Sequence, residues 1–154
     1  MTTRWTDKDL KRFQEHIART GTSNGFVATP QRRKPRNIES KMQQDVVKWW
    51  AMACIPYNVP EYLLMAFPLQ GARTPQNGAR MKAEGCRKGT LDMFLAVPRG
   101  RYHGLWIENK APEGVVSDEQ LVFMDSLLGS GYAVDICRTF DQATQAITRY
   151  LDRR

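Results

Sequence analysis

The fold is decided by the stretch Leu91-Asp92-Met93-Phe94-Leu95-Ala96-Val97, which is followed after a short polar gap by Gly104-Leu105-Trp106-Ile107-Glu108-Asn109-Lys110. Both runs are apolar and rich in strand-forming residues, and the gap is rich in turn formers. A hairpin centred near Gly100 pairs residues whose numbers add to about 200, so Asp92 is predicted to face Glu108. Directly opposed residues in such a hairpin have Cβ atoms about 4.5–5.5 Å apart.

Three charged side chains are thereby predicted to share one face of this hairpin. Side chains alternate between faces along a strand, so Glu108 and Lys110 point the same way, beside Asp92. Two close carboxylates repel each other, and a divalent cation removes that repulsion. Mg²⁺ takes one or two carboxylates and keeps several waters, which suits phosphate chemistry. The pattern therefore predicts a metal site with Lys110 beside it; the alternative is an exposed strand with alternating charges.

Length and composition indicate one globular domain, because the chain has 154 residues of which 42% are hydrophobic. No apolar run approaches the length of a membrane span, and the first residues lack a signal-peptide core, so we expect a cytoplasmic protein. Cys54, Cys86 and Cys137 are widely spaced and are expected to stay reduced. With only two histidines in the chain, the sequence argues against a zinc site or a His-dependent hydrolase.

The net charge of +7 indicates a polyanionic partner, most simply nucleic acid, although such an excess also occurs in proteins that bind none. Glycines at 85 and 89 are expected to let the chain approach a phosphate closely. The cations expected to contact DNA phosphates form two sets, namely Arg32, Arg33, Lys34 and Arg36 near the N-terminus, and Arg73, Arg80, Lys82, Arg87 and Lys88 ahead of Asp92.

Hydrophobic periodicity predicts a mixed sheet with helices packed on it, which is an α/β domain. An N-terminal arm over residues 1–37, with a short helix and a basic linker, is expected to precede a domain over 38–154. A Ser117-x-x-Gln120 capping box is expected to open a helix whose apolar stripe includes Leu128. The elements expected outside the hairpin are helices over 6–19, 38–53, 79–84, 117–129 and 141–151, a buried strand over 63–69 and a strand over 132–138.

This order of elements resembles the PD-(D/E)XK nuclease superfamily, whose core is an α/β restriction-endonuclease-like sheet flanked by helices. Within that superfamily the chain is similar to the VRR-Nuc family, from about Glu39 to Leu151. The stretches that carry the resemblance are 81–92, the Glu-x-Lys segment 104–110, 117–120, 131–134 and 147–151.

The resemblance implies roles for five residues of this chain. Asp92 matches the family's metal-binding aspartate, Glu108 and Lys110 match its Glu-x-Lys motif, and Glu39 matches a helix-borne metal-site acid. Gln120 matches the glutamine that opens the helix after the hairpin. Two of these have structural alternatives, since an acid is favoured at any helix N-terminus and a glutamine is explained by the capping box. The implied catalytic residues are thus Asp92, Glu108, Lys110 and Gln120, and the implied metal ligands are Glu39, Asp92 and Glu108.

Two residues depart from the family pattern. Leu91 stands where the family usually has proline, which leaves the aspartate ligand unaffected. Asn109 stands where the family usually has an apolar residue, and it is expected to point to the sheet face opposite Glu108. The second departure therefore bears on packing or assembly more than on chemistry.

The function that the resemblance implies is a Mg²⁺- or Mn²⁺-dependent DNA endonuclease. Small stand-alone VRR-Nuc proteins resemble Holliday-junction resolvases, are often encoded by phages and act as homodimers, whose two sites match the two strands of a junction. We expect DNA, branched or duplex, as the partner, a homodimer, no membrane, and a bacterial or phage-infected cell as the setting. The alternatives are a duplex-cutting repair or restriction-type nuclease, and a basic DNA-binding module whose nuclease site is inactive.

Overall fold

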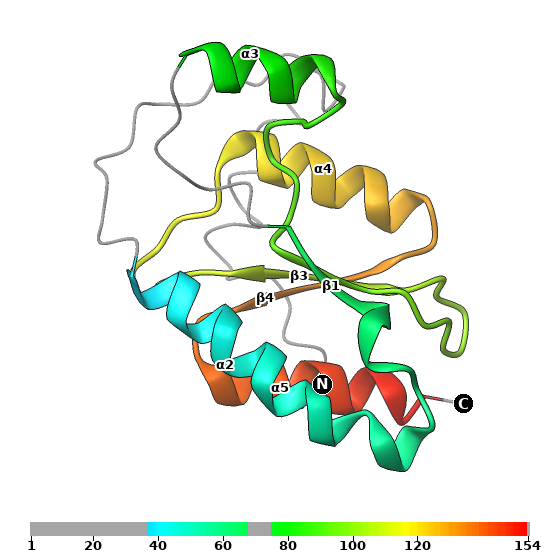
Figure 1. The fold of residues 1–154 in the computed structure, drawn as a ribbon. Helices are drawn as coiled ribbons and strands as arrows, with labels where there is room; N and C mark the ends of the chain where they lie inside the picture. The colour runs from blue at the N-terminus through cyan, green and yellow to red at the C-terminus, as the bar shows by residue number, and fades with distance from the viewer. Residues whose placement is uncertain (1–36, 68–74, 154) are drawn as a thin grey trace.

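The computed structural model describes residues 37–67 and 75–153, and these form one mixed sheet with helices on both of its faces (Figure 1). The predicted N-terminal helix and nearly all of the predicted basic linker lie outside the described residues. Across the described part of the chain, no helix is long and apolar enough to cross a membrane.

Four strands lie in the spatial order β1-β2-β3-β4. They span Leu64–Ala66 (β1), Met93–Leu95 (β2), Leu105–Asn109 (β3) and Ala133–Cys137 (β4). β1 and β2 pair antiparallel, β2 and β3 pair antiparallel, and β3 and β4 pair parallel. The helix between β3 and β4 supplies the crossover that a parallel pair needs.

The predicted hairpin and its register are confirmed. Met93 pairs with Ile107 and Leu95 pairs with Leu105, so opposed residues have numbers that add to 200. Both strands are shorter than the apolar runs that predict them. β2 leaves out Leu91, Asp92, Ala96 and Val97, and β3 leaves out Gly104 and Lys110.

Two long helices cover one face of the sheet and one helix covers the other (Figure 1). α2 (Asn37–Ala53) and α5 (Phe140–Leu151) lie side by side on the first face, and α4 (Asp118–Gly129) lies on the second. α3 (Pro75–Ala83) lies beyond α4, and two short 3₁₀ turns, Ile55–Tyr57 and Glu61–Leu63, connect α2 to β1.

The larger core lies between the sheet and the pair α2 and α5. The helical spacing of Met42, Val46, Trp49, Trp50 and Ala53 predicts an apolar face for α2, and it is confirmed: Met42, Val46 and Trp50 are buried, and Trp49 and Ala53 are partly buried against the same core. The Trp50 indole donates a hydrogen bond to the backbone oxygen of Glu61 over 2.8 Å, which satisfies its one polar atom. The apolar positions predicted for the last helix are likewise all buried, namely Ala143, Ala146, Ile147, Tyr150 and Leu151.

The smaller core lies under α4, and here one prediction is wrong. Leu121, Met124 and Leu127 are buried against Ile136 of β4, as the apolar stripe predicts. Leu128 is exposed instead, since it lies about 100° around the helix from Leu127 and turns out of the interface.

The first strand also differs from its prediction. It is an edge strand of three residues rather than a buried one over 63–69. Only Leu64 is buried, whereas Met65 is exposed, because an edge strand outside the area that α4 covers keeps one face partly open to solvent. Residues 68 and 69 lie outside the described part. The three cysteines are free, as expected.

Candidate active site

The two acids of the hairpin lie where the register predicts. Asp92 immediately precedes β2 and Glu108 lies in β3, one position beyond the pair Met93 and Ile107. Both acids are buried, and Glu108 has no exposed surface. The backbone N–H of Asn109 donates a hydrogen bond to Asp92 Oδ2 over 2.8 Å, which fixes the aspartate against β3. The hairpin therefore brings both carboxylates to the face that α4 covers.

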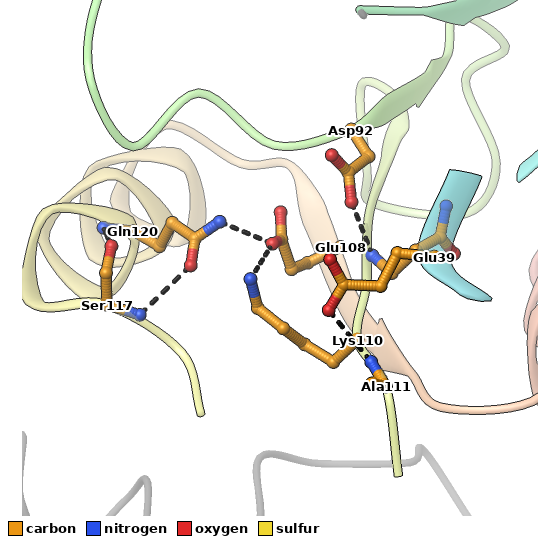
Figure 2. A network of polar contacts seen from close by, with 8 residues as sticks. Glu39, Asp92, Glu108, Lys110, Ala111, Ser117 and Gln120 are labelled. Carbon is orange, nitrogen blue, oxygen red and sulfur yellow. Dashed lines mark hydrogen bonds and ion pairs between the residues drawn. The ribbon is translucent and has the colours of Figure 1, made fainter. Parts of the chain in front are cut away.

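Glu108 is the centre of a small polar network (Figure 2). Its Oε1 atom forms an ion pair of 2.6 Å with Lys110 Nζ and accepts a hydrogen bond from the side-chain amide of Gln120. Its Oε2 atom is buried and has no hydrogen-bond partner among the described residues. The predicted pairing of Glu108 and Lys110 on one face is confirmed, and one carboxylate oxygen is left as a buried acceptor.

The electrostatics of this network favour a compensating charge. Burial, and to a lesser degree the nearby Asp92 carboxylate, raises the pKa of Glu108 to about 8, although Lys110 and Gln120 act to lower it. A cation bound between the two acids would favour the ionised form of both. The repulsion predicted from the opposed acids is therefore present, but loss of solvent contributes more than the second acid does.

Gln120 joins the first turn of α4 to the site. Its backbone N–H donates to the Ser117 hydroxyl over 3.2 Å, and its side-chain oxygen accepts from the Ser117 backbone N–H over 3.0 Å. The predicted capping box is thus complete. The same side chain donates from its amide nitrogen to Glu108, so Gln120 both completes the cap of α4 and contacts the candidate site. The contact between Ser117 and Gln120 was visible in the sequence, but its reach to Glu108 depends on how α4 packs on the sheet.

Glu39 lies in the first turn of α2, as predicted, and it ties that helix to the end of β3. Its Oε1 atom accepts a hydrogen bond of 2.9 Å from the backbone N–H of Ala111, directly after Lys110. Within residues 37–67 and 75–153, no three His, Cys, Asp or Glu side chains form a group that could hold a metal ion. Asp92 and Glu108 are two buried carboxylates on one face of the sheet that could share an ion. A ligand role for Glu39 stays a prediction.

The segment after α3 approaches the first turn of α4. Gly89 has a φ of +82°, and a Cβ there would meet backbone atoms of Glu119 and Gln120, the nearest carbon at 2.5 Å. Gly89 therefore makes a close approach to the first turn of α4, and the expected approach of this backbone to a phosphate stays a prediction. Gly85 also has a positive φ, of +96°, but nothing lies within 4 Å of a Cβ built there.

The cations predicted to bind DNA are only partly described. Arg80 and Lys82 lie on α3, and Arg87 and Lys88 lie on the loop that ends at Gly89; all four are exposed. The remaining members of the two sets fall outside the described residues, namely Arg32, Arg33, Lys34, Arg36 and Arg73.

Asn109 lies on the sheet face opposite the site, as expected from alternation along β3. Its side chain is fully buried, and neither polar atom has a hydrogen-bond partner among the described residues. A buried amide without partners is costly, so this departure from an apolar residue places a local weakness beneath α2 and α5.

The sheet is mixed and is flanked by helices, Asp92 precedes one hairpin strand, and Glu108 and Lys110 lie in and just after the next. This arrangement is the restriction-endonuclease-like fold. The VRR-NUC domain model matches residues 37–141, so the chain belongs to the VRR-NUC family of nucleases. Membership of a nuclease family implies DNA as the substrate.

Among solved structures, the chain is similar to a protein named "VRR_NUC domain protein". The two have a TM-score of 0.61 and 21% sequence identity, over 76% of this chain and 90% of that one. No curated protein matches the sequence.

Proposed function

We propose that this chain is a Mg²⁺- or Mn²⁺-dependent endodeoxyribonuclease that hydrolyses phosphodiester bonds in branched DNA, with the Holliday junction as the leading substrate. The observation that carries the proposal is the environment of Glu108. One oxygen of this buried carboxylate is held by Lys110 and Gln120, and the other has no partner among the described residues and lies on the same face as Asp92.

The residues present fit a hard divalent cation. Asp92 and Glu108 offer carboxylate oxygens, and the unpartnered Oε2 atom of Glu108 is a buried acceptor of the kind that an ion satisfies. Mg²⁺ needs only one or two carboxylates because it keeps several waters, so the lack of a third close acid among the described residues is compatible with it. When bound, such an ion acidifies water and offsets charge on a phosphate.

The chain's own groups would divide the remaining work. Lys110 lies 2.6 Å from Glu108, so its ammonium can stabilise phosphate oxygens or orient an attacking water beside the acids. Gln120 holds Glu108 in one orientation through an amide whose own direction is set by Ser117. The backbone N–H of Asn109 donates to Asp92 and helps to hold that carboxylate against β3.

Branched DNA is proposed on the grounds of symmetry. A homodimer would present two equivalent sites to the two equivalent strands of a four-way junction. We therefore propose a homodimer that selects DNA by shape rather than by sequence.

Cleavage of a four-way junction and of its separate duplex arms, with Mg²⁺, Mn²⁺ or a chelator, tests the proposal. Asp92→Asn and Lys110→Met each remove one site group, and both are expected to lose at least about 100-fold in rate. Glu113→Gln, an exposed acid just beyond the site, and Lys48→Met, an exposed lysine on α2, are the matched controls and should cut like the wild type.

The outcomes separate the candidate functions. Wild-type rates in both site variants would overturn the assignment of this site. Equal cutting of junction and arms would favour a duplex-cutting repair or restriction-type nuclease. Salt-dependent binding without cleavage in any divalent metal would favour an inactive DNA-binding module.

A further inference from the structure

α3 is the unusual helix of this fold, because none of its described side chains is buried. None of the residues from Gln76 to Ala83 is buried, and only Gly78 and Met81 are even partly covered. These two lie three apart and so share one face of the helix. Gln76 and Arg80 lie on the opposite side and are exposed.

A helix of this kind is weakly held by the chain alone. It has nine residues, and isolated helices shorter than about 12–15 residues are marginal in water. Gly78 within it lowers helix propensity further. In proteins most helical stability comes from packing of an apolar face, which α3 lacks among the described residues. The described fold therefore accounts poorly for the stability of α3.

The charge around α3 is strongly positive. Residues 75–89 contain four cations, Arg80, Lys82, Arg87 and Lys88, against the single acid Glu84. Arg80 and Glu84 lie 3.6 Å apart, but their side chains are 70% and 58% exposed, so the pair is screened and Arg80 can reach another anion. The segment is complementary to a polyanion.

The segment is also continuous with the candidate active site. Figure 1 shows α3 beyond α4, on the side of that helix away from the sheet. The loop after α3 ends at Gly89, which lies against the backbone of Glu119 and Gln120, and Gln120 binds Glu108. A ligand along α3 would therefore extend toward the acids.

We infer that α3 docks against duplex DNA, with Gln76 and Arg80 toward the nucleic acid, and that the helix becomes fully stable only in that complex. The inference rests on the proposed function and names the element that holds its substrate. The major groove of a duplex is about 12 Å wide and admits an α-helix. An arginine at the rim of the groove pairs with a phosphate, and a glutamine amide can donate to a phosphate or sugar oxygen, so neither contact depends on sequence.

Binding of a fluorescent DNA duplex to the full chain, measured by anisotropy in a chelator and over a range of salt, tests this. Arg80→Ala should weaken binding by about 5- to 10-fold and lower the salt slope by about one, because one phosphate contact is lost. Lys48→Ala removes the same charge from an exposed site on α2, across the sheet, and should change binding less than about 2-fold. Gln76→Ala should weaken binding without changing the salt slope, because an amide neutralises no phosphate.

A second pair of variants tests the coupling of helix stability to binding. Gly78→Ala adds helix propensity at a position where nothing lies within 4 Å of the added Cβ, and it should tighten binding about 2- to 5-fold. Gly129→Ala, at the last residue of α4 and equally open, is the matched control and should leave binding unchanged. Glu84→Gln removes the same ion pair as Arg80→Ala but should strengthen binding, which separates charge from helix support.

The inference is overturned if Arg80→Ala binds like Lys48→Ala and Gly78→Ala binds no tighter than Gly129→Ala. Because the assay needs no cleavage, its result is distinct from that of the nuclease test. A chain that binds through α3 but cuts no DNA would refute the nuclease proposal alone, whereas a chain that cuts DNA with unaffected α3 variants would refute this inference alone.

Discussion

Replacement of Gly89 by alanine should destabilise the protein more than the same replacement of Gly85, a glycine whose φ is also positive but whose surroundings are open. The residue has a φ of +82°, where a side chain costs about 1–2 kcal/mol. Its Cβ would lie 2.5 Å from the carbonyl carbon of Glu119 and 2.9 Å from the nitrogen of Gln120. Both are backbone atoms of the first turn of α4, so no side chain can move aside.

The magnitude follows from these two contributions. Forcing extra volume into a packed contact costs about 1–3 kcal/mol, so Gly89→Ala should lose about 2–5 kcal/mol in total. Gly85→Ala is the matched control, because its φ of +96° carries the same backbone penalty while nothing lies within 4 Å of its Cβ. It should lose only about 1–2 kcal/mol.

Thermal unfolding followed by circular dichroism measures the difference. For a protein of this size 1 kcal/mol shifts Tm by about 2–4 °C, so Gly85→Ala should melt about 2–8 °C below the wild type and Gly89→Ala about twice as far below. Equal melting temperatures for the two variants would show that the 85–89 loop does not press on α4, and the link between that loop and Gln120 would then be abandoned.

Three further substitutions test other parts of the structure. Ser117→Ala removes the side-chain cap of α4 and should cost about 0.5–2 kcal/mol by chemical denaturation, while the backbone N–H at position 117, which orients the Gln120 amide, is kept. Asp135→Asn should stabilise the protein at pH 8 more than at pH 5 in thermal melts. Burial raises the pKa of Asp135 to about 7, so the folded state favours the neutral carboxyl. As the pH rises toward that value the unfolded state ionises first, and the free energy of unfolding falls by at most about 4 kcal/mol. Tyr150→Phe should cost about 1–3 kcal/mol in urea unfolding, because the buried carbonyl of Val97 loses its 2.7 Å hydrogen bond.

Each of these variants has a control on the same chain. Ser117→Asp keeps a capping oxygen and should restore most of the stability, and a shortfall equal to that of the alanine variant would contradict the capping role. Asp141→Asn, an exposed acid of α5, should show no difference between pH 5 and pH 8, and an equal difference would remove Asp135 as the source. Tyr57→Phe breaks a bond to Asp152 on the surface and should cost less than Tyr150→Phe, and the reverse order would argue against burial as the cause.

The parts of this molecule that follow from local sequence were predicted well. The register of the hairpin depends on a short turn around Gly100 and on two apolar runs, and both are visible without a structure. α5, predicted over 141–151 and observed over Phe140–Leu151, is predicted almost to the residue, because its apolar positions recur at helical spacing. The pairing of Glu108 with Lys110 needs only the alternation of side chains along one strand.

The parts that depend on packing between distant segments were not predictable in the same way. The use of Gly89 as a contact with α4 needs the position of a helix about thirty residues further along the chain. The reach of Gln120 to Glu108 depends on the same docking. Asp135 reads as an ordinary polar residue in a strand, and only the cover of α5 over β4 explains its burial beside Arg149.

The hairpin determines which contacts of the site should survive heating or a substitution in the core. Asp92 and Glu108 belong to one short loop of chain, and closing such a loop costs little entropy. Gln120 contacts Glu108 and Glu39 contacts the backbone of Ala111, from two helices on opposite faces of the sheet, so both contacts depend on the packing of the two cores. Heating or a core substitution should therefore break the contacts of Glu39 and Gln120 first, while Asp92 and Glu108 still face each other across the hairpin.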